Sequence, residues 1–138
     1  MRQQSVEINQ LILVRLNPGD DLLDAVTLAA KENGVQNGLI LSGIGSLSAY
    51  RVHVVKTTGL PPGDVFFEGE GPFDILQVTG VVLDGRVHAH ITFSNTEKAM
   101  GGHLERGCRV LTFSVITLAD TPDADLTQWD MVGPLAPD

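Results

Sequence analysis

The sequence predicts an α+β domain with a mainly antiparallel sheet, one well-defined helix and a candidate second helix. Several segments alternate apolar and polar residues, which is the period of strands with one buried face. Turn signals join these segments: the two-residue Asp84-Gly85 turn is typical of an antiparallel hairpin, and a second hairpin is expected around Gly71-Pro72. Residues 22–30 differ, because their apolar side chains recur at the spacing of a helix.

The well-defined helix has recognisable start and stop signals. Asp20 is the expected N-cap, with Asp21 and Asp24 complementing the positive end of the helix dipole. Asn33-Gly34 is expected to end the helix, and residues 95–100 form the candidate second helix. Strands are expected at residues 6–16, 39–41, 47–55, 65–70, 73–83, 87–93 and 109–118, and residues 127–132 are able to form another strand.

Length and charge describe one small domain. The chain has 138 residues, 17 acidic and 9 basic side chains, and a net charge of −8. This length supports a single hydrophobic core, expected over about residues 6–119, followed by an acidic, proline-rich tail over residues 120–138. The negative charge repels polyanions and argues against non-specific binding to nucleic acids or membranes.

Cysteine usage and the N-terminal residues indicate the compartment. Cys108 is the single cysteine, which excludes an intramolecular disulfide and fits a reducing environment, and we interpret it as a small buried hydrophobe. Residues 1–5 contain no apolar signal segment, and no run approaches the roughly eighteen apolar residues of a membrane span. We therefore expect a cytoplasmic protein with no membrane partner.

The most informative segment is residues 85–93. Its apolar residues alternate with Arg86, His88, His90 and Thr92, so one strand face is apolar and the other is polar. His88 and His90 therefore point the same way, about 7 Å apart along the strand.

The other two histidines lie elsewhere in the chain. His103 follows His90 by thirteen residues and comes directly after Gly101-Gly102, which permits a sharp turn or a close backbone approach. If the intervening segment returns to the face of His88, three imidazoles form one cluster. His53 stands alone on the polar face of an expected strand, and we interpret it as a surface residue.

Three clustered imidazoles have two interpretations. Neutral imidazole is the commonest side-chain metal ligand near neutral pH, and three histidines with one open position are typical of catalytic zinc. Alternatively, the imidazoles form hydrogen bonds on a solvated or inter-subunit face. The spacing alone leaves both interpretations open.

Four motifs together resemble the PPC (plants and prokaryotes conserved) family. In chain order they are Gly38-Leu39-Ile40-Leu41-Ser42-Gly43-Ile44-Gly45-Ser46, Gly71-Pro72-Phe73-Asp74-Ile75-Leu76, His88-Ala89-His90 and Gly101-Gly102-His103-Leu104. The resemblance covers roughly residues 10–119, and the Gly-Gly-His-Leu motif after His-x-His is its most specific part.

The resemblance implies a free-standing prokaryotic PPC domain that assembles as a homotrimer. A trimer also fits the apolar strands, which outnumber what one helix can cover. The resemblance implies a divalent metal, zinc in the first instance, on His88, His90 and His103. Plant members bind A·T-rich DNA through AT-hooks. No AT-hook occurs here and the basic residues are scattered, so we expect no direct nucleic-acid binding by the isolated domain.

Further side chains are candidates for the surroundings of this site. Thr92, Glu97 and Glu105 could orient an imidazole, and Arg15 could bind a small anionic ligand, because guanidinium matches a carboxylate. The sequence assigns no catalytic residue. The predicted function is therefore a metal-stabilised module or a small-carboxylate-binding protein. Alternatives are gene regulation through a DNA-binding partner, or a zinc-dependent enzyme acting on a small keto acid, by similarity to the His-x-His arrangement of acetolactate decarboxylases.

Overall fold

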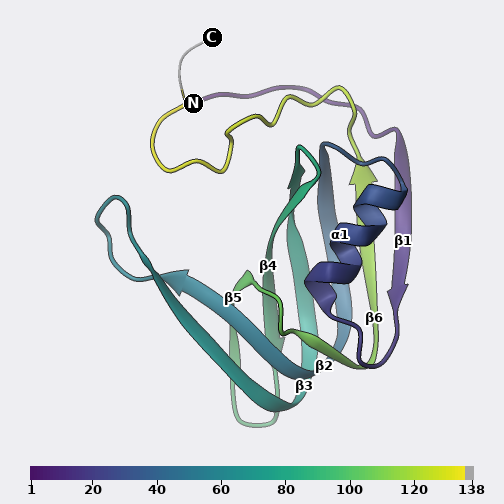
Figure 1. Cartoon of the computed structure of the whole chain (residues 1–138), viewed down its shortest axis with the longest axis vertical. Helices are drawn as coiled ribbons and strands as arrows, with labels where there is room; N and C mark the ends of the chain where they lie inside the picture. Colours follow the sequence, from purple (N-terminus) through teal and green to yellow (C-terminus); the bar gives the residue numbers. More distant parts are fainter. Residues whose placement is uncertain (136–138) are drawn as a thin grey trace.

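The computed structural model describes residues 1–135 and contains a six-stranded antiparallel sheet with a helix against one face (Figure 1). The elements are β1 (Gln10–Leu16), α1 (Leu22–Glu32), β2 (Gly38–Val55), β3 (Asp64–Leu83), β4 (Arg86–Ser94), β5 (Ala99–Leu104) and β6 (Arg109–Asp120). The strand order is β1-β6-β2-β3-β4-β5, with an additional pairing between β2 and β5. The mainly antiparallel α+β fold predicted from the sequence is thus confirmed.

Helix α1 begins one residue later than predicted. Asp21, not Asp20, is the N-cap, and its carboxylate accepts a hydrogen bond from the backbone N–H of Asp24 at 3.1 Å. The carboxylate of Asp20 instead accepts from the N–H of Asn17 at 2.8 Å, within the preceding turn. The predicted stop is confirmed, since Asn33 is the C-cap and the next residue is a glycine with a φ of +69°.

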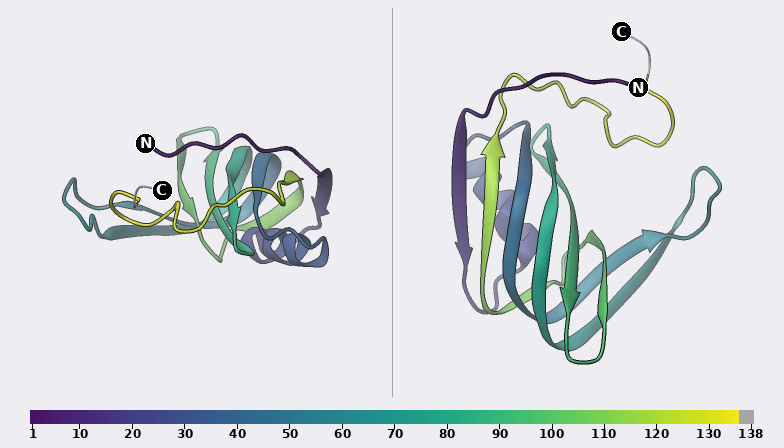
Figure 2. Two further views of the ribbon diagram at one scale, coloured as in Figure 1. Left: turned by 90° about the horizontal axis from the view of Figure 1, so that it is seen from above. Right: turned by 180° about the vertical axis from the view of Figure 1, so that it is seen from behind.

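Helix α1 lies against one face of the sheet in both views of Figure 2, and the buried apolar residues of the helix and the sheet form one core cluster. Leu22, Val26, Ala29 and Ala30 of the helix are buried. The apolar residues of β4 point to this side and are also buried, which confirms the alternation predicted for this strand: Val87, Ala89, Ile91 and Phe93. The sheet face on the other side of β4 therefore carries the histidines. In the described part of the chain, no helix is long and apolar enough to cross a membrane.

Strands β2 and β3 are longer than predicted. The prediction of a hairpin at Gly71-Pro72 is wrong, because β3 continues through these residues. The expected strands at residues 39–41 and 47–55 are both parts of β2, and those at 65–70 and 73–83 are both parts of β3. Between the pairs Leu47–Phe73 and Ala49–Glu70, two residues of β3 oppose one of β2, so Gly71-Pro72 forms a bulge. The last part of β2, the first part of β3 and the loop at residues 56–63 that joins them project from the sheet as an arm (Figure 1).

Two tight hairpins place β4 and β5. Asp84 and Gly85 have φ values of +49° and +76°, as a two-residue turn of the predicted kind requires. No second helix forms at residues 95–100, so that prediction is wrong. There the Asn95 side chain accepts hydrogen bonds from the N–H groups of Glu97 and Lys98, both at 2.9 Å. This turn is an alternative to a helix and returns the chain directly into β5.

The segment after β6 forms turns, so residues 127–132 do not form the further strand that their sequence would allow. The N–H of Trp129 bonds to the carbonyl of Leu126 at 3.1 Å, and that of Met131 bonds to the carbonyl of Gln128 at 3.0 Å. These local bonds replace strand pairing. Leu126 instead packs with Leu83 and Ala124 in a small second apolar cluster, against which Trp129 also lies.

Candidate metal centre

Strand pairing brings the four histidines together. His103 on β5 pairs with His90 on β4 and also with His53 on β2. Directly paired residues of antiparallel strands project to the same face with their Cβ atoms about 4.5–5.5 Å apart. His88 lies two residues before His90 on β4 and therefore shares that face. The sheet thus places four imidazoles side by side.

Gly101 and Gly102 allow β5 to fit between β4 and β2. A Cβ atom on Gly102 would lie only 2.6 Å from the carbonyl oxygen of His53, and one on Gly101 would collide with the carbonyl oxygen of Ile91. Both contacts are with backbone, which cannot swing away. The glycine pair that precedes His103 is therefore needed for close approach of three strands, one of the two roles predicted for it.

The rings of His103 and its neighbours are in contact. The centroid of His103 lies 4.3 Å from that of His53, 4.6 Å from that of His88 and 5.6 Å from that of His90. The rings of His88 and His90 are stacked with centroids 5.7 Å apart. His103 is thus the centre of the cluster. His53, interpreted from sequence as a surface residue, is a member of it.

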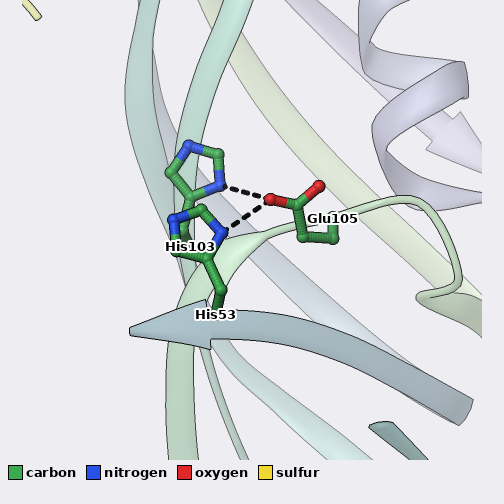
Figure 3. Close-up of side chains that lie close together, drawn as sticks. All are labelled: His53, His103 and Glu105. Carbon is green, nitrogen blue, oxygen red and sulfur yellow. Dashed lines mark hydrogen bonds and ion pairs between the residues drawn. The ribbon is translucent and has the colours of Figure 1, made fainter. Parts of the chain in front are cut away.

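Glu105 lies against two of these imidazoles (Figure 3). Its Oε1 accepts a hydrogen bond from the Nδ1–H of His53 at 2.6 Å and lies 3.3 Å from the Nδ1 of His103. The latter pair does not form a hydrogen bond, so the buried Nδ1 of His103 has no hydrogen-bond partner in the described structure. One donor atom from each of His53, His103 and Glu105 lies within 4.8 Å of the other two, a spacing that could hold a metal ion.

A second carboxylate contacts the cluster at His88. Asp130, in the segment after β6, accepts hydrogen bonds from the Nδ1–H of His88 at 3.0 Å and forms an ion pair with Arg86 at 2.7 Å. Burial by itself would raise the pKa of Asp130, but the hydrogen bonds from His88 and Arg86 more than offset it and lower the pKa. Asp130 is therefore a carboxylate at neutral pH.

Crowding keeps the central imidazoles neutral. The pKa of His103 is lowered, first by burial and then by positive charge on His53 and His88, against an opposing effect of Glu105. The pKa of His90 is lowered by burial and by charge on His88 and His53. A neutral imidazole has a free nitrogen lone pair, so both side chains can act as metal ligands at neutral pH.

Comparison with known proteins now decides the family. Residues 3–121 match the family model described as the Plants and Prokaryotes Conserved (PCC) domain. The chain belongs to this family. The match confirms the resemblance found in the sequence, because PCC and PPC are two abbreviations of the same family name.

Solved structures share the PCC fold. A metal-containing protein from Archaeoglobus fulgidus is 24% identical with a TM-score of 0.78, and the match covers 90% of this chain and 89% of that protein. A plant- and prokaryote-conserved (PPC) protein from Pyrococcus horikoshii is 24% identical with a TM-score of 0.76, over 91% of this chain and 87% of that one. At this level of identity, the similarity shows the fold alone.

Curated relatives are much longer than this PCC chain. A protein named bifunctional protein GlmU from Synechococcus is 33% identical over 111 residues, and a second GlmU from another Synechococcus strain is 31% identical over 109 residues. The matches cover 80% and 78% of this chain but only 17% of the length of each relative.

The other residues predicted around the site have different positions in the PCC domain. Thr92 lies two residues after His90 and shares its face of β4, whereas Glu97 is in the β4–β5 turn, beside a cavity of about 690 Å³. Arg15 is on β1, at the opposite end of the strand order from β5, where its guanidinium donates to the side-chain oxygen of Asn17 at 2.6 Å. Of the four candidates, Glu105 contacts imidazoles directly.

Proposed function

We propose that this PCC-domain protein binds a divalent metal ion, zinc in the first instance, through His88, His90 and His103. The position of His103 carries the proposal, because its ring lies within 4.6 Å of that of His88 and 5.6 Å of that of His90. At these separations, modest side-chain rotations can direct three nitrogens to a common point about 2.0–2.1 Å from each.

The chemistry of the donors supports zinc. The lowered pKa values of His90 and His103 favour neutral ligands, and the unpartnered Nδ1 of His103 is a buried polar atom for which a ligand would compensate. The Archaeoglobus fulgidus relative is described as metal-containing. A metal held by three imidazoles keeps an open position for water or for an oxygen of a small carboxylate.

A competing ligand set consists of His53, His103 and Glu105, whose donor atoms already lie within 4.8 Å of one another. We favour the three-histidine set because Glu105 is engaged by the Nδ1–H of His53 at 2.6 Å. A carboxylate in this position orients imidazoles without binding the metal itself. If the three-histidine set binds the metal, the His53→Ala variant retains one equivalent. If the competing set binds it, His53→Ala loses the metal and His90→Ala retains it.

Elemental analysis tests the proposal. The protein is purified without a His-tag and without chelator, then incubated with zinc at neutral pH and desalted. We expect about one equivalent of zinc in the wild type and less than about a tenth in His88→Ala or His90→Ala. Circular dichroism shows whether the variants keep their fold. A wild type with less than about a tenth of an equivalent of any transition metal contradicts the proposal.

The metal site supports the function of a metal-stabilised module or of a protein that binds small carboxylates. The open coordination position favours the second role, and it also makes a zinc-dependent enzyme acting on a small keto acid the next candidate. A panel of small carboxylates and keto acids separates these functions. If zinc raises the melting temperature and none of the panel compounds raises it further, the protein is a metal-stabilised module. A further rise in melting temperature without turnover indicates binding of that compound, and zinc-dependent product formation indicates an enzyme.

A homotrimer fits the apolar residues that the single chain leaves exposed. Exposed large apolar side chains occur on β1, β2, β3 and β6: Leu11, Leu13, Leu41, Ile44, Leu76, Leu111 and Phe113. β1 is also an edge strand, with unpaired backbone groups along one side. Association would cover both features. Light scattering should give three times the chain mass of 14.8 kDa, and a mass near one chain contradicts the trimer.

Gene regulation is a second candidate function, because related structures from Bacteroides thetaiotaomicron and Ralstonia eutropha are those of proteins proposed to bind DNA. Charge argues for a role through a partner. Arg86 and Arg106 are each paired with an aspartate at 2.7 and 2.6 Å, and the net charge is −8. We expect no gel shift of A·T-rich duplex at physiological salt. A salt-sensitive shift at submicromolar protein contradicts this expectation.

A further inference from the structure

The segment after β6 belongs to the histidine site, although it lies beyond the residues that match the family model. The match ends at residue 121, whereas the chain continues along one end of the sheet (Figures 1 and 2). Leu126 is buried against Leu83, and Trp129 packs against the same cluster. These apolar contacts fix the segment where it passes β4.

The same contacts place the carboxylate of Asp130 beside His88. The Asp130 side chain is only 14% exposed, and its Oδ2 accepts a hydrogen bond from His88 Nδ1 at 3.0 Å and forms an ion pair with Arg86 Nη2 at 2.7 Å. Arg86 and His88 are two residues apart on β4 and share a face, so Arg86 holds the carboxylate in position over the ring. His88, Trp129 and Asp130 also line a pocket of about 320 Å³ between the segment and the sheet.

A carboxylate at Nδ1 determines the form of a neutral imidazole. A carboxylate only accepts hydrogen bonds, so the proton of neutral His88 is held on Nδ1 and the lone pair is left on Nε2. The hydrogen bond also fixes the rotation of the ring about its side-chain bonds. Imidazole ligands of metals are commonly held in this way by an outer carboxylate, and loss of the carboxylate typically weakens metal binding by 10–100-fold.

We propose that Asp130 is a positioning residue, which holds His88 as the Nδ1–H tautomer with Nε2 free to bind the metal. The proposal rests on the proposed metal site and extends it to a segment outside the matched family domain. The site is completed by residues 122–130, and metal affinity depends on the docking of that segment.

The first test uses metal-free protein, so it does not depend on metal binding. Long-range ¹H–¹⁵N correlation spectra report which nitrogen of each histidine carries the proton. We expect wild-type His88 to be the Nδ1–H tautomer, and Asp130→Asn to show a mixture or the Nε2–H tautomer, because an amide can donate to Nδ1 as well as accept from it. Asp123→Asn, an equal charge change at an exposed position of the same segment, should match the wild type.

The second test measures zinc affinity by competition with a chromophoric chelator. We expect Asp130→Asn to bind zinc 10–100-fold more weakly than the wild type, and Asp123→Asn to bind as the wild type does. Fluorescence of Trp129, the single tryptophan, shows whether the segment stays docked in each variant.

The outcomes separate the two proposals. A wild type that holds His88 as the Nδ1–H tautomer but binds no zinc overturns the metal site and leaves the orienting contact in place. A wild type that binds zinc, with Asp130→Asn docked and unchanged in both tautomer and affinity, overturns the role of Asp130. An affinity loss accompanied by undocking, with the His88 tautomer unchanged, also overturns it, since the effect is then structural.

Discussion

His53 and His103 are paired across β2 and β5, and their rings stack with centroids 4.3 Å apart and planes inclined by 22°. The two residues are 50 positions apart in the chain, and their pairing is one of two that join β2 to β5. This short contact converts the edge strand β5 into a strand with neighbours on both sides. The cluster of imidazoles therefore depends on how closely β5 approaches β2.

Replacing Gly102 should separate these strands. In Gly102→Ala, the new Cβ would lie 2.6 Å from the carbonyl oxygen of His53, so β5 must move away from β2. We expect a loss of about 1–3 kcal/mol in the free energy of unfolding, measured in denaturant, and weaker zinc binding. Gly59→Ala is the matched control, because its Cβ meets only the Thr57 hydroxyl, at 3.5 Å. Equal effects of both substitutions would contradict the prediction.

The stability of the metal-free protein should fall as the pH drops below about 6.5. The pKa values of His90 and His103 are lowered in the folded state from the ordinary value of 6.5. Below pH 6.5 the unfolded chain therefore binds protons that the folded chain does not, and this difference favours unfolding until the pH passes the native pKa values. Above pH 6.5 both states carry neutral imidazoles, so the two side chains contribute no pH dependence.

Denaturant unfolding at pH 7.5 and 5.5 measures this effect in chelator-treated protein. We expect a lower free energy of unfolding at pH 5.5, and a smaller difference between the two pH values in His103→Gln, which removes one of the titrating groups. A stability that is equal or higher at pH 5.5 in the wild type, or an undiminished difference in the variant, would show that the cluster is not the cause.

Local patterns predicted the part of the site that one strand supplies. The alternation in β4 correctly places Val87 and Ala89 in the core and so directs His88 and His90 to the other face. The turn at Asp84-Gly85 was also predictable, because both residues need positive φ and Asp-Gly is suited to it. Such patterns are encoded within a few residues, so they can be recognised in the sequence.

The rest of the site depends on contacts between distant segments. The place of His53 in the cluster follows from the register between β2 and β5, and that of Asp130 from the packing of Trp129 after β6. The bulge at Gly71-Pro72 has the composition of a turn, and only the length of β2 shows that β3 continues through it. Neither register nor docking of a tail has a local signature in sequence.

Cys108 should be unreactive in the folded protein. Its side chain is fully buried, and its sulfur lies 3.4 Å from the N–H and 3.2 Å from the carbonyl oxygen of Arg51. Burial raises the pKa of the thiol to about 11, so little thiolate forms near neutral pH. An aromatic disulfide reagent at pH 8 should modify less than about a tenth of the protein in an hour, and all of it in denaturant. Rapid modification of the folded protein would contradict the burial.

The sheet face away from α1 should carry the interface of the proposed trimer. Ile44 on β2 is 54% exposed, and it follows Gly43, which packs against the core residues Ile116 and Val78, so Ile44 points outward. A charge there would be costly to bury between subunits. We expect Ile44→Asp to reduce the mass in light scattering from three chains to one, while circular dichroism stays that of the folded protein.

Leu28 is the matched control for this experiment. It is also 54% exposed but lies on α1, on the other side of the molecule, so Leu28→Asp should keep the mass of three chains. Dissociation by Leu28→Asp with retention by Ile44→Asp would place the interface on the helix side instead. A trimer that survives both substitutions would show that neither surface is its centre, and the exposed residues of edge strand β1, Leu11 and Leu13, would then be the next to test.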